Sequence, residues 1–225
     1  MDTRLRRSAT PAAAVGAAVL LVVACVGRPA PDWKSSAQAA LERAVAADLA
    51  GEARVAQAEY AQARNALART GRADLVARAE LTRCAVRTAS LSPEACDGFE
   101  ALRADSGAAE RAYADYLAGR ATDAALLPPQ HRPFAAPALE GDAAAVALRG
   151  VADPLARLVA AGVLVRRGAT NRAAIEVAVD TASDQGWRRP LLAWLTLQRT
   201  LAEQAGDTAA ADRLRRRIEL VAGQR

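Results

Sequence analysis

The sequence predicts an all-α protein built from antiparallel helical hairpins. Alanine is abundant and aromatic residues make up only 4% of the chain, and alanine is the best helix former because it loses no side-chain entropy. β-Branched residues are scattered rather than alternating with polar ones, so no strand pattern is present. Apolar residues recur at helical spacing in stretches that end at glycines and short turns, which favours antiparallel neighbours.

Five helices are expected in the first half of the chain. Glycines and a Ser-Pro pair separate them, and the expected ranges are 36–50, 52–69, 72–88, 92–106 and 108–118. The fourth helix is expected to begin at Ser92-Pro93-Glu94. Serine would be the cap, proline would take the first helical position, and glutamate would lie near the positive end of the helix dipole.

Helical periodicity fails between residues 119 and 140, where four prolines lie close together: Pro128, Pro129, Pro133 and Pro137. We interpret 119–140 as a proline-rich connector with a short helical piece at 122–127. The connector either joins two sets of hairpins or forms a loop that closes over or contacts a partner.

Helices are expected to resume at 142–148, 154–167, 171–184, 187–205 and 208–221. The stretch 154–167 is apolar nearly all round, which is typical of a buried helix, and it is too short to span a bilayer. The stretch 187–205 is the richest in large apolar residues, and we expect its Trp194 to lie in the core. The hairpins therefore fall into two groups, 37–118 and 141–225.

The N-terminus has a different pattern. Three arginines within the first seven residues precede an apolar core at 12–24 that only Gly16 interrupts, and this core ends at Cys25. A basic start, an apolar core and a small-residue end are the three parts of an export signal. The core is shorter than the ~20 residues of a spanning helix. The alternatives are an uncleaved N-terminal anchor helix and a plain signal with an incidental cysteine.

The stretch from Val22 to Cys25, Val-Val-Ala-Cys, resembles the lipobox of bacterial lipoproteins. The resemblance implies that signal 1–24 is removed, that Cys25 carries fatty acyl chains such as palmitate, and that 25–36 is a lipidated tether. Two or three chains form a stable anchor. In that family an aspartate after the cysteine disfavours release to the outer membrane, and here Val26 follows. The resemblance thus implies the periplasmic face of the outer membrane.

Composition limits the remaining choices. The mature chain would have about 200 residues, enough for one domain with a sizeable core or for two small ones. The formal charge of +5 falls to +3 without the signal, and Lys34 is the only lysine. An exported chain rarely meets nucleic acid, so we predict no nucleic-acid partner. The mild basicity indicates arginine-rich bias first and weak attraction to anionic lipid or acidic partners second.

Small and apolar residues follow three glycines at a common spacing. The sets are Gly51 with Ala56 and Tyr60, Gly168 with Ala173 and Val177, and Gly206 with Ala211 and Arg215, where the adjacent Leu214 takes the apolar place. Small residues at such places let two helices approach closely. The alternative to a repeat is a generic alanine-rich helical array in which small residues simply mark close packing.

The last hairpin resembles the tetratricopeptide repeat, because Trp194, Leu197 and Leu201 have the family's spacing and Ala211 follows in the second helix. Gln198 replaces the family's glycine, the turn is one residue longer, and no proline closes the unit. Gly168 and Gly206 lie 38 residues apart, against about 34 in the family. The resemblance implies a TPR-like solenoid of stacked hairpins with an extended concave surface.

The cysteines predict a disulfide. If lipid occupies Cys25, Cys84 and Cys96 remain, and the periplasm is oxidising. The turn at 90–93 between them would fold two helices back on each other and bring the thiols together. The alternative is two separately buried thiols, and metal binding by two cysteines without a nearby histidine is not expected.

No catalytic pattern is visible. His131 is the only histidine and lies in the connector without a serine or cysteine nucleophile near it in sequence. Phosphate-binding loops, zinc-protease motifs and calcium loops are absent. The arginines Arg213, Arg215, Arg216 and Arg217 form either a solvated face near the negative helix end or a contact for lipid headgroups or an acidic partner.

These patterns together predict a non-enzymatic lipoprotein without cofactor, metal or small-molecule substrate. We expect it to act as a protein-binding scaffold or assembly factor in the cell envelope, anchored in the outer membrane by its N-terminal lipid. Its partners would be the membrane and another envelope protein. The alternative is an accessory factor that binds peptidoglycan or anionic lipid through arginine-rich faces.

Overall fold

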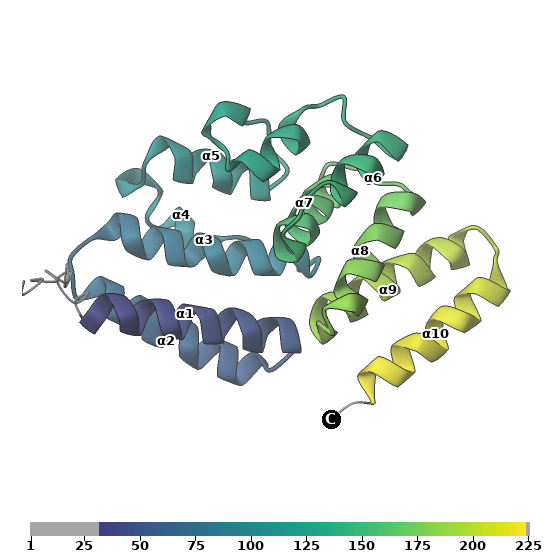
Figure 1. Cartoon of the computed structure of the whole chain (residues 1–225), viewed down its shortest axis with the longest axis horizontal. Coiled ribbons are helices and arrows are strands. Elements are labelled where there is room, and N and C mark those ends of the chain that lie inside the picture. The colour runs from purple at the N-terminus through teal and green to yellow at the C-terminus, as the bar shows by residue number, and fades with distance from the viewer. Residues whose placement is uncertain (1–31, 224–225) are drawn as a thin grey trace, which may run out of the picture. The chain divides into compact units, whose positions relative to one another are not determined.

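The computed structural model describes residues 32–223, which form helices and loops without any strand in that range (Figure 1). The all-α prediction is confirmed. The predicted export signal, the predicted lipobox with Cys25 and most of the predicted tether lie outside the described residues. The α-helices are α1 (Asp32–Ala50), α2 (Ala53–Ala68), α3 (Ala73–Ala89), α4 (Asp97–Glu100), α5 (Ala108–Leu117), α6 (Gly141–Arg149), α7 (Pro154–Arg166), α8 (Arg172–Asp184), α9 (Arg188–Gln204) and α10 (Thr208–Ala222).

Most helices match their predicted ranges to within one or two residues, but α1 does not. It begins at Asp32 rather than at residue 36, so residues 32–36, which we assigned to the tether, are helical. Asp32 lies in the first turn, where a carboxylate favours the positive end of the helix dipole. A cap at Ser35 or Ser36, the start that the sequence favoured, is therefore wrong, because both serines lie inside the helix.

The predicted fourth helix at 92–106 is wrong in extent. Residues 92–96 are not helical, α4 has only four residues, and a short 3-10 turn follows at Arg103–Asp105. The carbonyl of Ser92 accepts a hydrogen bond of 2.8 Å from the Arg166 guanidinium of α7, and Cys96 is joined to Cys84. These tertiary contacts fix the segment in a non-helical conformation, so Pro93 does not open a helix.

Helix ends follow the predicted glycines. At Gly168 and Gly206 the backbone φ angles are +68° and +72°, a left-handed conformation that side chains with a Cβ rarely adopt. The following amides, of Ala169 and Asp207, donate back to the carbonyls of Leu164 and Ala202 at 2.9 Å. This six-to-one bond is the Schellman motif, and it satisfies a carbonyl that the helix leaves unpaired.

Helices α3 and α7 lie at the centre of the main core and pack directly on each other. Their approach depends on Gly162, because a Cβ at this position would overlap the carbonyl group of Thr88. Thr88 is itself buried, and its hydroxyl donates 3.0 Å to the carbonyl of Cys84. The backbones of α3 and α7 are therefore in close contact at Thr88 and Gly162.

Contacts also join helices that are distant in sequence. Besides the neighbouring pairs α1–α2, α7–α8, α8–α9 and α9–α10, helix α1 packs against α9. The buried carboxylate of Asp48 in α1 forms an ion pair with Arg189 of α9. Repeats of a solenoid contact only their sequence neighbours, so the α1–α9 and α3–α7 contacts depart from that pattern, and the TPR-like solenoid stays a prediction.

Trp194 is confirmed as a core residue. It is 0% exposed, and its indole Nε1 donates a hydrogen bond of 2.9 Å to the carbonyl of Ala89 at the end of α3. Leu197 is partly buried, whereas Leu201, at the third position of the same spacing, is 41% exposed. Helix α9 therefore has one face in the core and one face open.

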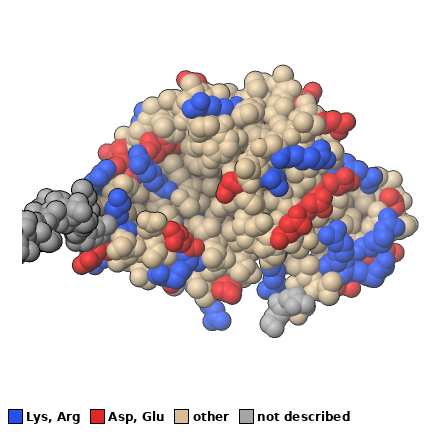
Figure 2. All heavy atoms as spheres, in the orientation of Figure 1, with Lys and Arg blue, Asp and Glu red and all other residues tan. Residues whose placement is uncertain are grey.

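Within residues 32–223 no helix is both long and apolar enough to cross a membrane. The face in Figure 2 carries mixed charges. Over the C-terminal helices, however, a band of acidic side chains lies beside a group of basic ones.

Candidate functional site

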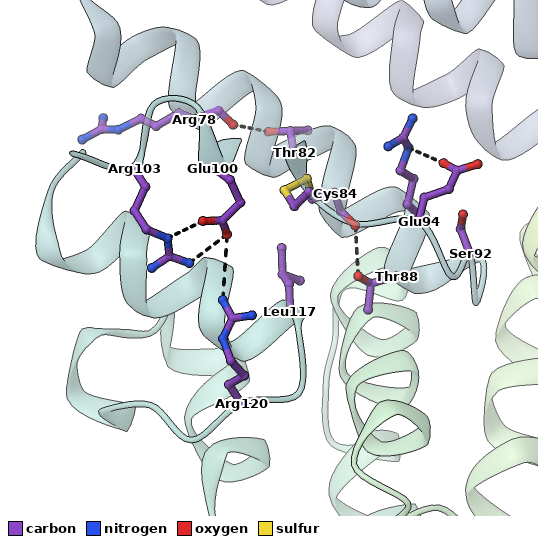
Figure 3. Close-up of a disulfide and its surroundings, with 12 residues drawn as sticks. Arg78, Thr82, Cys84, Thr88, Ser92, Glu94, Glu100, Arg103, Leu117 and Arg120 are labelled. Atoms are coloured by element: carbon purple, nitrogen blue, oxygen red, sulfur yellow. Dashed lines mark hydrogen bonds and ion pairs between the residues drawn. A yellow bond between two sulfur atoms is a disulfide. The ribbon is translucent and has the colours of Figure 1, made fainter. Parts of the chain in front are cut away.

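The disulfide prediction places Cys84 and Cys96 together, and the structure does the same. Their Cα atoms are 5.7 Å apart and their sulfur atoms are joined, as Figure 3 shows. Cys84 is buried in α3, and Cys96 is the residue before α4. The bond fastens the non-helical segment 92–96 to α3. That it forms in the oxidising envelope stays a prediction.

A surface ion-pair network lies beside the disulfide. Arg103 donates to Glu100 at 2.6 Å and to Asp115 at 2.9 Å, and Arg120 also reaches both carboxylates (Figure 3 shows its pairing with Glu100). Hydrogen bonding from Arg103 lowers the pKa of Glu100. For Asp115 burial acts to raise the pKa, but the bonds from Arg120 and Arg103 outweigh it and lower it. The network has the geometry of a structural clamp rather than a catalytic pair.

The proline-rich connector is folded onto the helices. It contains two 3-10 turns, Ala124–Leu126 and Pro129–Ala135, of which only the first was expected. Leu127 and Phe134 are 2% and 1% exposed. The Arg167 guanidinium of α7 donates to the carbonyls of Phe134 and Ala136 at 2.5 and 3.0 Å. The connector is therefore part of the core that surrounds α7.

His131 is buried in this connector, although the sequence suggested an incidental loop residue. Its ring lies 5.6 Å from Tyr113 and 5.1 Å from Tyr116, centroid to centroid, and its Nδ1 is 3.2 Å from the Tyr116 hydroxyl. Burial lowers the pKa of His131 to about 4, although the negative charge of Asp153 acts in the opposite direction. His131 is therefore a neutral core residue near pH 7.

A pocket of about 600 Å³ opens beside His131, between α3, α5, the connector and the start of α7. Its apolar lining includes Leu81, Leu127 and Val159, and its rim carries the ion pair of Arg78 with Glu110 at 2.8 Å. The volume is within the range of small-molecule sites. No serine or cysteine is among its lining residues, so this pocket contains no nucleophile of those two types for His131 to activate.

A second hollow, of about 780 Å³, lies between α8, α9 and α10. We call it the α8–α10 groove. Helices α8 and α10 both pack on α9, and the space between them is the groove. Its lining residues are Arg172, Ile175, Glu176, Gln198, Leu201, Ala202, Ala205, Asp207, Ala210, Arg213, Leu214 and Arg217.

The four predicted arginines of α10 fall into different environments. Arg213 and Arg217 line the α8–α10 groove, and Arg215 pairs with Asp212 at 3.0 Å. Arg216 is exposed. In residues 32–223 no carboxylate lies within 4.0 Å of Arg213, Arg216 or Arg217. Their charges are therefore open to a ligand.

The sequence did not indicate the groove itself. Glu176 and Gln198 belong to it but looked like ordinary helix-surface residues, because the groove exists only after α8 and α10 both dock on α9. The available signal was the arginine cluster of α10, because the sequence offers Arg213 and Arg217 as one candidate contact for lipid headgroups or an acidic partner. No cluster of three or more potential metal ligands occurs among the described residues.

Comparison with known proteins gives this chain no relative from which to take a function. No protein-family model, no curated protein and no solved structure matches it. The resemblances to the lipobox and to the tetratricopeptide repeat therefore remain resemblances, and function has to be argued from the site.

Proposed function

We propose that this protein is a lipid-anchored scaffold or assembly factor of the bacterial cell envelope that binds another envelope protein in the α8–α10 groove. Cys25 would carry the lipid on the periplasmic face of the outer membrane. The basic, apolar and Val-Val-Ala-Cys order of residues 4–25 supports the anchor. Helices α7 to α10 would form the TPR-like part of the fold.

One observation carries the binding proposal, namely a groove with an apolar floor and open charges. Leu201 is 41% exposed on the floor beside Leu214, and Arg213 and Arg217 have no ion-pair partner in residues 32–223. An apolar centre with charged groups at its rim is the arrangement of protein interfaces. Arginine is also among the residues that contribute most to their binding energy.

A second candidate is binding of peptidoglycan or anionic lipid, and the exposed arginines of α10 favour it. Anionic headgroups would be attracted by Arg213, Arg216 and Arg217. Exposed Glu176 and Asp180 of α8 lie close by, however, and would repel the same headgroups. The mixed charge fits a protein surface better than a uniformly anionic one.

Photocrosslinking in living cells tests the binding proposal. A photoreactive amino acid replaces Ala205, which lines the groove and is exposed, and in a matched strain it replaces the exposed Val146 of α6. We expect one discrete protein adduct from position 205 and none of that mass from position 146. The adduct should disappear when Arg213→Glu and Arg217→Glu are added. Equal adducts from both positions, or none, would contradict the proposal.

The anchor has its own test. Cys25→Ala should abolish incorporation of a clickable fatty acid and release the protein from the membrane fraction. A matched Cys96→Ala variant should still incorporate the label. If the Cys25 variant is labelled and sediments with membranes, the protein is not a lipoprotein of the expected kind.

A further inference from the structure

Opposite charges flank the α8–α10 groove. Glu176 is the α8 carboxylate in its lining, and Asp180 and Asp184 follow it on the same helix beyond the lining, whereas Arg213 and Arg217 line the α10 wall. On α8, Glu176, Asp180 and Asp184 are exposed and lie four residues apart, so they form one acidic stripe along the helix. On α10, Arg213 and Arg217 are exposed and also lie four residues apart. The acidic band and the basic group that Figure 2 shows over the C-terminal helices agree with this arrangement.

The floor between the walls is apolar. Leu201 is 41% exposed, and Ala202, Ala210 and Leu214 lie around it with at most 9% exposure. The carbonyl Oε1 of Gln198 is also buried in the groove lining without a hydrogen-bond partner in the described chain. An occupant therefore meets an apolar strip with charged edges on both sides.

The sign of the charges reverses at one end of the groove. Arg172 stands at the start of α8, before the acidic stripe, and Asp207 stands at the start of α10, before the basic residues. One oxygen of Asp207 already accepts the amide of Ala210 at 2.9 Å as a helix cap. The pattern of charges therefore has a direction along the groove.

We infer that the partner inserts an amphipathic helix with unlike edges into this groove. This inference rests on the proposed function and names the chemistry of the partner. The apolar stripe of the helix covers Leu201 and Leu214. Its edge toward α8 carries lysine or arginine opposite Glu176, and its edge toward α10 carries aspartate or glutamate opposite Arg213 and Arg217.

A helix suits the groove because both walls are themselves helices on a common third helix, α9. Helix-in-groove recognition uses an apolar face with anchors at helical spacing. The fifteen residues of α10 span about 22 Å at 1.5 Å per residue, so a partner helix of similar length covers the wall. A helix whose edge carries the same charge as the wall that it faces is also excluded, because like charges across an interface repel each other.

Synthetic helices test the inference with the full-length protein in detergent. Three fluorescent peptides of equal length share one leucine stripe. The first has one basic and one acidic edge, the second has two acidic edges, and the third has two basic edges. We expect the first to bind wild-type protein at least about tenfold more tightly than the other two.

Charge reversal on one wall sharpens the test. The variant Glu176→Lys, Asp180→Lys, Asp184→Lys makes both walls basic, and we expect it to prefer the peptide with two acidic edges. A matched control, Glu52→Lys, Asp97→Lys, Asp105→Lys, changes the same net charge at exposed positions away from the groove. It should keep the wild-type preference, and both variants should keep the wild-type helical circular dichroism.

The outcomes separate the inference from the proposed function. If position 205 gives its crosslink but the three peptides bind equally or not at all, the partner is not a helix with unlike edges, and the binding proposal stands. If the Cys25→Ala protein binds vesicles of anionic phospholipid through Arg213 and Arg217, and the peptides compete for none of this binding, the groove is a lipid site and the inference is overturned. A preference that switches with the α8 charges supports it.

Discussion

Helices α7 and α10 both carry several arginines, but they use them differently. In α7, Arg166 donates to the carbonyls of Leu117 and Ser92 at 3.1 and 2.8 Å. Burial lowers the pKa of Arg166. In α10, Arg213 and Arg217 are exposed, and the only arginine there with an ion pair is Arg215, with Asp212.

The difference follows from how many elements cover each helix. Helix α7 contacts α3, α5, α6, α8 and the connector, whereas α10 has α9 as its one close helix neighbour. An arginine on a covered helix meets carbonyls that need donors, and it becomes a structural brace. An arginine on a helix covered on one side keeps its charge in solvent, where a partner can reach it. The comparison predicts that stability resides around α3 and α7 and recognition around α10.

The largest effect on stability is expected at the residue where α9 meets the core. Trp194→Ala should lower the free energy of unfolding by about 3–5 kcal/mol, because it removes a fully buried ring and its bond to the Ala89 carbonyl. Urea unfolding measures this. Val146→Ala, at a position that is 66% exposed, should change stability by less than about 0.5 kcal/mol. A loss under about 1 kcal/mol for Trp194→Ala would contradict the assignment of the core.

Acid should weaken the connector region through His131. The unfolded pKa near 6.5 exceeds the folded pKa of about 4. The unfolded chain therefore binds more protons between these values, and stability falls as pH drops from about 6.5 to about 4. The full loss is about 3 kcal/mol, and below pH 4 this residue adds no further change.

The matched variant for this prediction is His131→Gln, which cannot titrate. Urea unfolding at pH 7 and pH 4.5 should show a smaller loss on acidification in the variant than in the wild type. Tyr113, Tyr116 and Asp153 face or surround the ring and stay the same in both proteins. Identical pH slopes in the two proteins would show that His131 is not buried as a neutral group.

Removal of the disulfide should lower the free energy of unfolding by about as much as acidification does through His131. The two cysteines close a loop with a separation of 12 residues, and the chain-entropy model gives about 3 kcal/mol for a loop of that order. Cys84→Ala should lower the melting temperature without moving the protein off the membrane. Alkylation of unreduced, denatured protein from the periplasm checks the bond itself, since two free thiols in the mature domain would show that it does not form.

Loss of the two hydrogen bonds that Arg166 of α7 donates should have a smaller effect on stability. Arg166→Met keeps the apolar stem but leaves the carbonyls of Leu117 and Ser92 without their donor, which should cost about 1–3 kcal/mol. Chemical denaturation measures the change. Because the bond to Ser92 holds the segment before α4, proteolysis near residues 92–96 should also become faster. An unchanged unfolding curve would contradict the conclusion that Arg166 of α7 stabilises the fold, unlike the exposed arginines of α10.

The smallest effect on stability is expected on α10. Arg213→Ala with Arg217→Ala should shift the free energy of unfolding by no more than about 0.5 kcal/mol, because both side chains are exposed without ion pairs in the described chain. The same variant should weaken the crosslink from position 205. Strong destabilisation would mean that these arginines brace the fold, as those of α7 do.

The sequence alone determined the local features of this protein. Helix propensity, glycine signals and apolar periodicity depend on neighbouring residues only, so they located most helices and the ends at Gly168 and Gly206. They also led to the pairing of Cys84 with Cys96, because the turn between them is short. The buried position of Trp194 followed from the concentration of large apolar residues in one helix.

The tertiary structure decided what depends on residues far apart. Arg166 of α7 bonds to Ser92 in a segment that is not helical where the local signals predicted a helix, and α5 and α7 bury His131 in a connector that looked like a loop. The requirement for glycine at position 162 is evident only in the folded chain, where α7 packs on α3. The α8–α10 groove arose in the same way, because its charged walls and apolar floor come from three helices that meet only when the chain is folded.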